Sequence, residues 1–257
     1  MTSTPALSGA HIALLALVGF LAGAINAVAG GGTLISFPAL LVAGYPAITA
    51  NVTNTVALVP GYLGGSIAYR AELEGQQDRL RVLGAVSIIG ALAGSYLLVI
   101  SPAAVFRRIV PWLILFACGL LAAQPWVARL IRREENTARV EHRSLPLLVA
   151  QFLGAVYGAY FGAGLGVIAL AVLGIFLTDT LQRLNALKGL LSLVINVVAA
   201  VYFALFGPVA WLPAAIMAGA SLAGGHLGVG VARKLSPTVL RSAVILFGVA
   251  ATVRLLV

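Results

Sequence analysis

The residues of this chain with the strongest chemical character lie inside apolar segments. Lys188 is the only basic residue well within such a segment, and Asn185 and Ser192 stand three residues before it and four after it. This spacing places the three side chains on one face of a helix. An ammonium group with amide and hydroxyl neighbours is suited to binding an anion, although Lys188 lies near one end of its segment and could instead extend to the interface.

A second polar group opens the corresponding segment in the first half of the chain. It contains Asn51, Asn54 and Thr55. When the two halves are aligned, Asn51 corresponds to Asn185 and Asn54 to Lys188. We therefore expect both groups to contact one substrate, the first through neutral side chains and the second through a charged one.

A glycine-rich break precedes each polar group. A shift of 132 residues lays Gly30 on Gly162 and Gly32 on Gly164. Such breaks are tolerated in a membrane where the irregular backbone is buried in protein or lines a water-filled cavity. Interrupted apolar segments at matching positions in two halves indicate the substrate site of a transporter. The residues of the two breaks that we expect to line this site are Asn26, Gly30, Gly31, Gly32, Thr33, Gly162, Ala163 and Gly164.

A new helix is expected to begin after each break, near Thr33 and near Gly166. The free N–H groups at a helix N-terminus attract an anion, and glycine lets a ligand approach the backbone. The alternative is that the small residues only allow close helix packing. Tyr157 fits either substrate contact or aromatic packing. Packing is our interpretation for five other glycines, namely Gly23, Gly61, Gly65, Gly90 and Gly94.

Composition places the chain in a lipid bilayer. It has 257 residues, of which 61% are hydrophobic and 9% charged, whereas a soluble domain carries about 25% charged residues. The net charge of +9 arises from basic residues between the apolar runs, which is the pattern of membrane topology and argues against nucleic acid as a partner. The first apolar stretch has no basic flank of a signal peptide, so we expect it to be retained.

The apolar pattern predicts two kinds of segment. Two long ones, approximately 11–44 and 145–178, hold the breaks and are expected to form two helical pieces each. The predicted fold is an all-α membrane protein: a polytopic helical bundle of two repeats, each a broken, re-entrant or hairpin helix followed by three transmembrane helices. The plain spans, each near the ~20 residues that cross a bilayer core, cover approximately 47–69, 80–100, 107–128, 183–205, 208–232 and 238–257.

Arginine positions divide and orient the chain. Arginines gather in loop 70–81 and in the stretch 129–144, but in the second half the basic residues gather in loop 232–241, as Arg233, Lys234 and Arg241. Positive residues favour the cytoplasm, so this swapped pattern predicts inverted repeats with both termini outside the cytoplasm. The predicted units are a first transmembrane repeat at 1–128, a cytoplasmic linker at 129–144 and a second transmembrane repeat at 145–257.

Several chemical classes are disfavoured. All seven acidic residues lie in loops or at segment ends, which argues against a cation carrier and a carboxylate proton relay. The chain lacks a Walker motif, and its three histidines have no metal-ligand spacing. No Ser/His/Asp or Cys/His arrangement suggests an enzyme. We therefore expect no catalysis, no cofactor and no metal.

Three motifs in order resemble the TauE/SafE family of sulfite and sulfonate exporters. They are the run from Asn26 to Thr33, the run from Thr49 to Thr55 and the run from Arg183 to Asn196. The similarity covers roughly residues 10–257. It implies a two-repeat transporter whose substrate is sulfite, sulfoacetate, another sulfonate or a related sulfur compound.

The sequence thus predicts a secondary transporter of the bacterial inner membrane that exports a small anion, sulfite or an organosulfonate, by alternating access. One alternative is uptake of a sulfur-containing anion. The other is a membrane scaffold or assembly subunit whose glycines only pack helices. Expected partners are the anion and the lipid bilayer, and a homodimer is compatible with this architecture.

Overall fold

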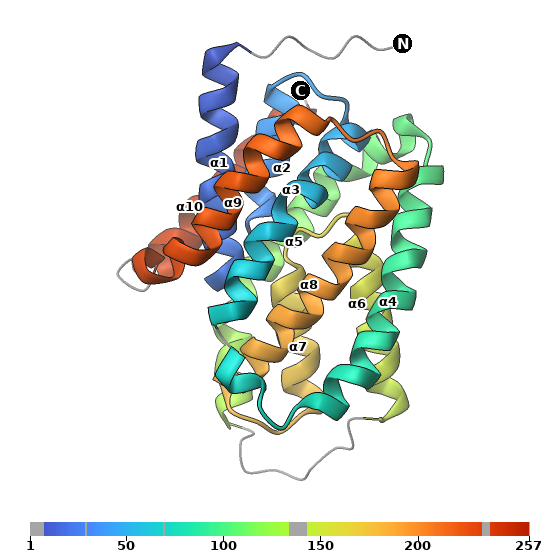
Figure 1. Ribbon diagram of the computed structural model, residues 1–257, viewed down its shortest axis with the longest axis vertical. Helices are drawn as coiled ribbons and strands as arrows, with labels where there is room; N and C mark the ends of the chain where they lie inside the picture. The colour runs from blue at the N-terminus through green and yellow to red at the C-terminus, as the bar shows by residue number, and fades with distance from the viewer. Residues whose placement is uncertain (1–7, 29, 69, 134–142, 233–236, 257) are drawn as a thin grey trace.

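The computed structural model describes residues 8–28, 30–68, 70–133, 143–232 and 237–256. Every regular element among them is a helix, as the sequence predicts (Figure 1). The helices are α1 (Gly9–Val28), α2 (Thr33–Val42), α3 (Ala47–Ala68), the short 3-10 helix η1 (Arg70–Leu73), α4 (Gln77–Ile100), α5 (Ala103–Arg133), α6 (Leu145–Tyr160), α7 (Leu165–Phe176), α8 (Leu181–Phe206), α9 (Trp211–Ala232) and α10 (Pro237–Leu256).

Each predicted broken segment forms two helices that meet at its glycines. α1 and α2 form one hairpin, and α6 and α7 form the other. Figure 1 shows the first hairpin opening toward the end of the molecule where the described chain begins, and the second opening toward the opposite end. The second helix of each pair begins at Thr33 or at Leu165, close to the predicted starts.

Four of the helices in the described residues are long and apolar enough to cross a membrane, namely α1, α4, α5 and α8. The expected spans at α3, α9 and α10 are helices of 20 to 22 residues, and their crossing of the membrane stays a prediction. α5 continues to Arg133, so it takes up the first part of the expected linker. Residues 134–142, 233–236 and both chain ends lie outside the described residues.

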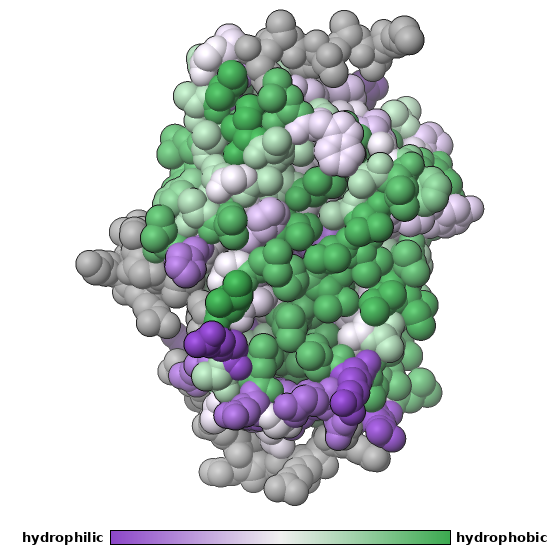
Figure 2. Space-filling view, in the orientation of Figure 1, coloured by the Kyte–Doolittle hydropathy of each residue, from purple (hydrophilic) through white to green (hydrophobic). Residues whose placement is uncertain are grey.

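The outer surface suits a lipid environment. Ile89, Trp112 and Leu246 are 61%, 65% and 70% exposed, far more than apolar side chains of a soluble core. Figure 2 shows apolar residues across the middle of one face and polar residues gathered at its lower end, where α4 and α6 begin. A face of this kind is stable against hydrocarbon and costly in water.

Glycines let the helices of the bundle approach closely. A Cβ atom on Gly90 of α4 would lie 2.7 Å from the carbonyl oxygen of Phe152 in α6, and one on Gly61 would lie 3.0 Å from that of Ser221 in α9. Gly23 and Gly94 leave even less room beside their neighbours. The packing interpretation of these four glycines is confirmed.

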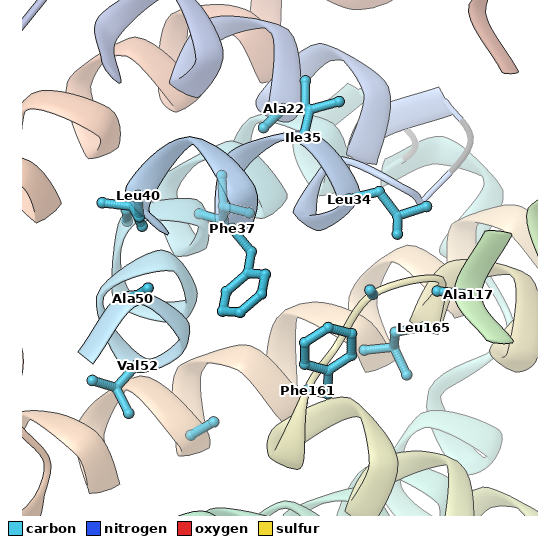
Figure 3. Close-up of a cluster of buried hydrophobic side chains, with 14 of the residues drawn as sticks. Ala22, Leu34, Ile35, Phe37, Leu40, Ala50, Val52, Ala117, Phe161 and Leu165 are labelled. Carbon is cyan, nitrogen blue, oxygen red and sulfur yellow. The ribbon is translucent and has the colours of Figure 1, made fainter. Parts of the chain in front are cut away.

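The largest apolar cluster joins both hairpins. Phe37 of α2 meets Phe161, which follows α6, edge to face with ring centroids 5.4 Å apart (Figure 3). Both rings are fully buried. Leu34 and Leu165, from the first turns of α2 and α7, belong to the same cluster. The core therefore fixes the two breaks with respect to each other.

Candidate functional site

The two breaks have the same backbone hydrogen bond at the 132-residue spacing. The N–H of Gly30 donates to the carbonyl of Ile25 at 3.0 Å, and that of Gly162 donates to the carbonyl of Tyr157 at 3.2 Å. Gly30 and Gly162 have φ angles of +77° and +78°, in the left-handed region that glycine adopts without strain. The two breaks therefore share this local geometry at Gly30 and Gly162, but not at the next aligned pair, because Gly32 has a φ of −59° and Gly164 a φ of +75°.

The breaks touch each other. A Cβ atom on Gly30 would lie 2.7 Å from the Cα atom of Gly166, in the first turn of α7. No side chain larger than hydrogen fits at Gly30 without displacing backbone. The tip of the first hairpin, between α1 and α2, and the start of α7 therefore meet backbone to backbone.

A cavity opens beside this contact. It is narrow, with a cavity volume of about 20 Å³, is partly open to solvent, and lies among α1, α3, α7 and α8. Five of the predicted site residues line it: Asn26, Gly30, Asn185, Lys188 and Ser192. The other lining residues are Ala27, Tyr62, Gly65, Ser66, Gly166, Ala186 and Gly189.

Lys188 is the charged residue of this cavity. Its side chain is only 5% exposed, and its Nζ atom donates to Asn185 Oδ1 at 3.3 Å. Within the described part of the chain, no carboxylate forms an ion pair with it. A buried charge is costly unless it is paired, and an amide oxygen compensates an ammonium group only partly. The cavity therefore favours a negatively charged occupant.

Neutral hydrogen-bond donors accompany the ammonium group. Asn26 Oδ1 accepts from the N–H of Gly32 at 2.8 Å, which leaves the Nδ2 group buried without a partner among the described residues. The hydroxyls of Ser66 and Ser192 are buried and unpartnered in the same sense. Asn26, Ser66 and Ser192 come from three different helices and all line the cavity. Together with Lys188 they can donate hydrogen bonds to one oxyanion.

Three predicted site residues of α3 lie apart from the cavity lining. The Nδ2 group of Asn51 donates to the carbonyl of Tyr160 at 2.9 Å, and that of Asn54 donates to Thr33 Oγ1 at 3.5 Å. Thr55 Oγ1 donates to the carbonyl of Asn51 at 3.1 Å. The donors expected to hold an anion are thus engaged within the protein, and Thr33 takes part in the same cluster.

The remaining predicted residues shape the breaks. A Cβ atom on Gly31 would lie 3.3 Å from a methyl of Leu121 in α5, and Gly32 packs against the backbone of Ala22. Tyr157 donates its hydroxyl to the carbonyl of Ala163 at 2.6 Å.

Within the second break, a Cβ atom on Gly162 would lie 2.9 Å from the carbonyl oxygen of Gly158. Gly164 adopts a φ of +75° as the residue before α7 and faces Ala117. None of these residues is part of the cavity lining.

Sequence reasoning missed Tyr62 and Ser66 as lining residues. They stand four residues apart on α3 and therefore share a face, a signal that the sequence contained. Gly65 was assigned to packing alone, yet it also lines the cavity. Its packing partner is Ala27, because a Cβ atom on Gly65 would lie 3.3 Å from the Cβ atom of Ala27. Gly166 also lines the cavity; it was named as the expected start of a helix but was not among the predicted site residues.

An ionic cluster fixes the start of α8, the helix that carries Lys188. Asp179 accepts from Arg79 Nη1 at 2.6 Å and from Arg183 Nε at 2.9 Å, and so links α4 to the turn before α8. Burial opposes ionisation of Asp179, but hydrogen bonds from Arg79, the Thr180 N–H and Arg183 outweigh it and hold the pKa of the carboxyl below its ordinary value. Gln76, 1% exposed, donates to the carbonyl of Arg183 at 3.1 Å.

The comparison with protein families decides the class. A family model described as sulfite exporter TauE/SafE matches residues 15–255. The chain belongs to the TauE/SafE family. It is therefore a membrane transporter of this family, and the resemblance inferred from its three motifs is confirmed.

Three similar proteins are described as probable membrane transporters. A probable membrane transporter protein of Haemophilus influenzae strain Rd is 30% identical over 95% of this chain and 94% of its own length. The probable membrane transporter protein ORF9 of a Sinorhizobium species is 26% identical over 95% of this chain and 92% of its own length. The probable membrane transporter protein YfcA of Escherichia coli K12 is 25% identical over 84% of this chain and 79% of its own length. No solved structure matches the chain.

Proposed function

We propose that this TauE/SafE transporter exports a small oxyanion, sulfite or an organosulfonate, across the bacterial inner membrane by alternating access. The observation that carries the proposal is the buried ammonium group of Lys188 in the cavity beside the two breaks, which forms no ion pair with any of the residues that the structure describes. The donors of Asn26, Ser66 and Ser192, which have no partner in the described part of the chain, support it, because an oxyanion has several oxygens that each accept hydrogen bonds.

The proposed carrier consists of two inverted repeats, with the termini outside and the linker in the cytoplasm. The two hairpins opening toward opposite ends of the molecule support this arrangement (Figure 1). The matching hydrogen bonds of Gly30 and Gly162 support it as well. Alternating access then consists of movement of one repeat against the other around the cavity.

The test is transport by purified protein in proteoliposomes, with sulfite, sulfoacetate, a short alkanesulfonate and sulfate supplied in turn. Wild-type protein is expected to move sulfite or a sulfonate. Lys188→Gln should weaken the apparent affinity roughly tenfold to a hundredfold, since hydrogen bonds to charged groups are worth about 1.5–3 kcal/mol. Lys188→Arg should rescue only in part, because a planar guanidinium needs a different geometry.

Arg81→Gln is the matched control, because it removes a positive charge from an exposed side chain. It should leave the affinity unchanged. Equal affinity in Lys188→Gln and wild type would remove Lys188 from the site. If none of the anions is transported, the result would support the alternative that the protein is a membrane scaffold. Transport only toward the cytoplasmic side of oriented vesicles would support uptake.

A further inference from the structure

A second buried polar cluster has the opposite hydrogen-bonding character to the cavity. Asn51 and Asn54 stand three residues apart on α3, with side chains 0% and 2% exposed. Both of their Nδ2 groups are engaged, and both Oδ1 atoms are buried without a hydrogen-bond partner among the described residues. A buried carbonyl oxygen left without a partner is unfavourable, so two of them side by side on a helix face call for an electropositive occupant.

The surroundings of these oxygens supply further acceptors. Asn51 contacts the carbonyl of Tyr160, at the C-terminus of α6, and this end of a helix carries negative partial charge. Asn54 donates to Thr33 Oγ1, which has a second lone pair as a fourth acceptor, whereas the N-terminus of α2 at Thr33 carries positive partial charge that opposes a cation. The amide orientation of Asn51 is fixed, because only its NH₂ group can pair with a carbonyl oxygen. The cluster therefore offers oxygen atoms where the cavity at Lys188 offers donors.

The type of cation follows from the ligands. All four are neutral oxygens, and the described residues contain no group of three or more His, Cys, Asp or Glu side chains that could hold a metal. Divalent cations are bound through carboxylates, and transition metals through nitrogen or sulfur ligands. A monovalent alkali cation needs neither. In transporters with broken helices, carbonyls at half-helix C-termini and unwound backbone coordinate Na⁺.

We propose that Asn51, Asn54, Thr33 and the carbonyl of Tyr160 bind a monovalent alkali cation, with Na⁺ as the ion to test first. The positions of the acidic residues argue against a cation carrier and a carboxylate proton relay, but a monovalent cation held by neutral oxygens needs no carboxylate. Cation binding itself does not depend on the anion that the transporter carries.

The backbone connects this cluster to the anion cavity. Gly32 donates its N–H to Asn26, which lines the cavity, and the next residue is Thr33, which belongs to the cation cluster. A cation that draws Thr33 toward Asn54 therefore also positions Asn26. This link gives a physical basis for coupling the two ions, and the coupling rests on the proposed anion transport.

The experiment measures thermal stability of the purified protein without substrate, in NaCl, KCl, LiCl and choline chloride at equal ionic strength. Wild type should show a saturable rise of Tm with Na⁺ that choline does not produce. Asn54→Leu should abolish this rise. Asn54→Asp should retain it with at least tenfold tighter apparent affinity, because a carboxylate adds negative charge. A rise with K⁺ but not Na⁺ would overturn the assignment to sodium.

Gln151→Leu is the matched control. Gln151 is a buried amide between α4 and α6 that donates to Ser87 at 2.8 Å, so its loss should lower Tm equally in every salt and leave the Na⁺ shift intact. If Asn54→Leu does not fold, Thr33→Val removes one ligand at nearly constant shape and should weaken the Na⁺ shift several-fold.

Equal Tm in all four chlorides would overturn the cation site, and the two oxygens would then hold water. An unchanged Na⁺ shift in the folded Asn54→Leu or Thr33→Val variant would overturn it too. Because no anion substrate is present, these outcomes leave the transport proposal standing. Failure of every anion in the proteoliposome panel would likewise leave a measured Na⁺ shift intact.

Discussion

Gly30 and Gly166 lie so close that a Cβ atom on Gly30 would be 2.7 Å from the Cα atom of Gly166. The contact joins the tip of the first hairpin, between α1 and α2, to the first turn of α7, in the second half of the chain. Gly30 is also fixed by its φ of +77°. Two independent constraints, one of conformation and one of space, thus require glycine at the same position.

Gly30→Ala should lower both stability and transport. A non-glycine residue in the left-handed region costs about 1–2 kcal/mol, and the clash with Gly166 adds to it. Thermal unfolding and proteoliposome flux measure the two effects. Gly84→Ala is the control, because its Cβ would meet nothing within 4 Å, and alanine favours a helix interior by about 1 kcal/mol. Wild-type Tm and flux in Gly30→Ala would contradict the contact.

Gly189→Val should block the cavity while preserving the fold. Gly189 lines the cavity on α8, and a Cβ atom there would meet nothing within 4 Å. The added methyl groups fill the space of the anion, so we expect at least a tenfold loss of flux at low substrate with little change in Tm. Gly219→Val in α9, where a Cβ also meets open space, should leave flux unaltered. Normal kinetics in Gly189→Val would show that the anion uses another path.

Asp179→Asn should destabilise the protein at neutral pH. It removes the negatively charged carboxylate between Arg79 and Arg183. Hydrogen bonds to charged groups contribute about 1.5–3 kcal/mol to the free energy of unfolding. Asp78→Asn breaks an exposed pair with Arg81 and should change Tm little. Thermal unfolding of both variants beside wild type measures the difference.

The pH dependence of this effect has a definite sign. The folded-state pKa of Asp179 is lowered from its ordinary value of 3.8, so its stabilisation is present above that value and is lost as pH falls through the folded-state pKa. The Tm gap between wild type and Asp179→Asn should therefore be full at pH 7 and shrink below about pH 4. A gap that is constant down to pH 2.5 would assign the effect to packing.

Thiol labelling tests the orientation. In a Cys118→Ala background, Gln77→Cys should react only from the cytoplasmic side and Pro208→Cys only from outside. Gln77 begins α4 and Pro208 follows α8, and Figure 1 places these points at opposite ends of the molecule. Reaction of both positions from one side would exclude the inverted arrangement.

The sequence predicted the local features of the site well. The helix starts near Thr33 and Leu165 follow from glycines that interrupt apolar runs, and the shared face of Asn185, Lys188 and Ser192 follows from helical spacing. Both signals lie within a few residues of chain, so no knowledge of the fold is needed to detect them.

The features that sequence could not supply depend on partners far along the chain. Asn51 was expected to offer its amide donors to an anion, but Tyr160, more than a hundred residues away, accepts from it. Ser66 reaches the cavity only because the end of α3 packs beside α8. Spacing places a side chain on a face of its helix, whereas tertiary packing decides which neighbour that face meets.

The shortness of the two returning helices has an electrical consequence. α2 has 10 residues and α7 has 12, so at 1.5 Å per residue they extend about 15 and 18 Å, roughly half of a bilayer core of about 30 Å. In the proposed carrier, a monoanion that leaves the cavity without a bound cation crosses only part of the membrane potential. A full crossing is worth about 2.3 kcal/mol per 100 mV, so each half-passage carries roughly 1 kcal/mol per 100 mV, and the voltage across the membrane biases release toward the positive side.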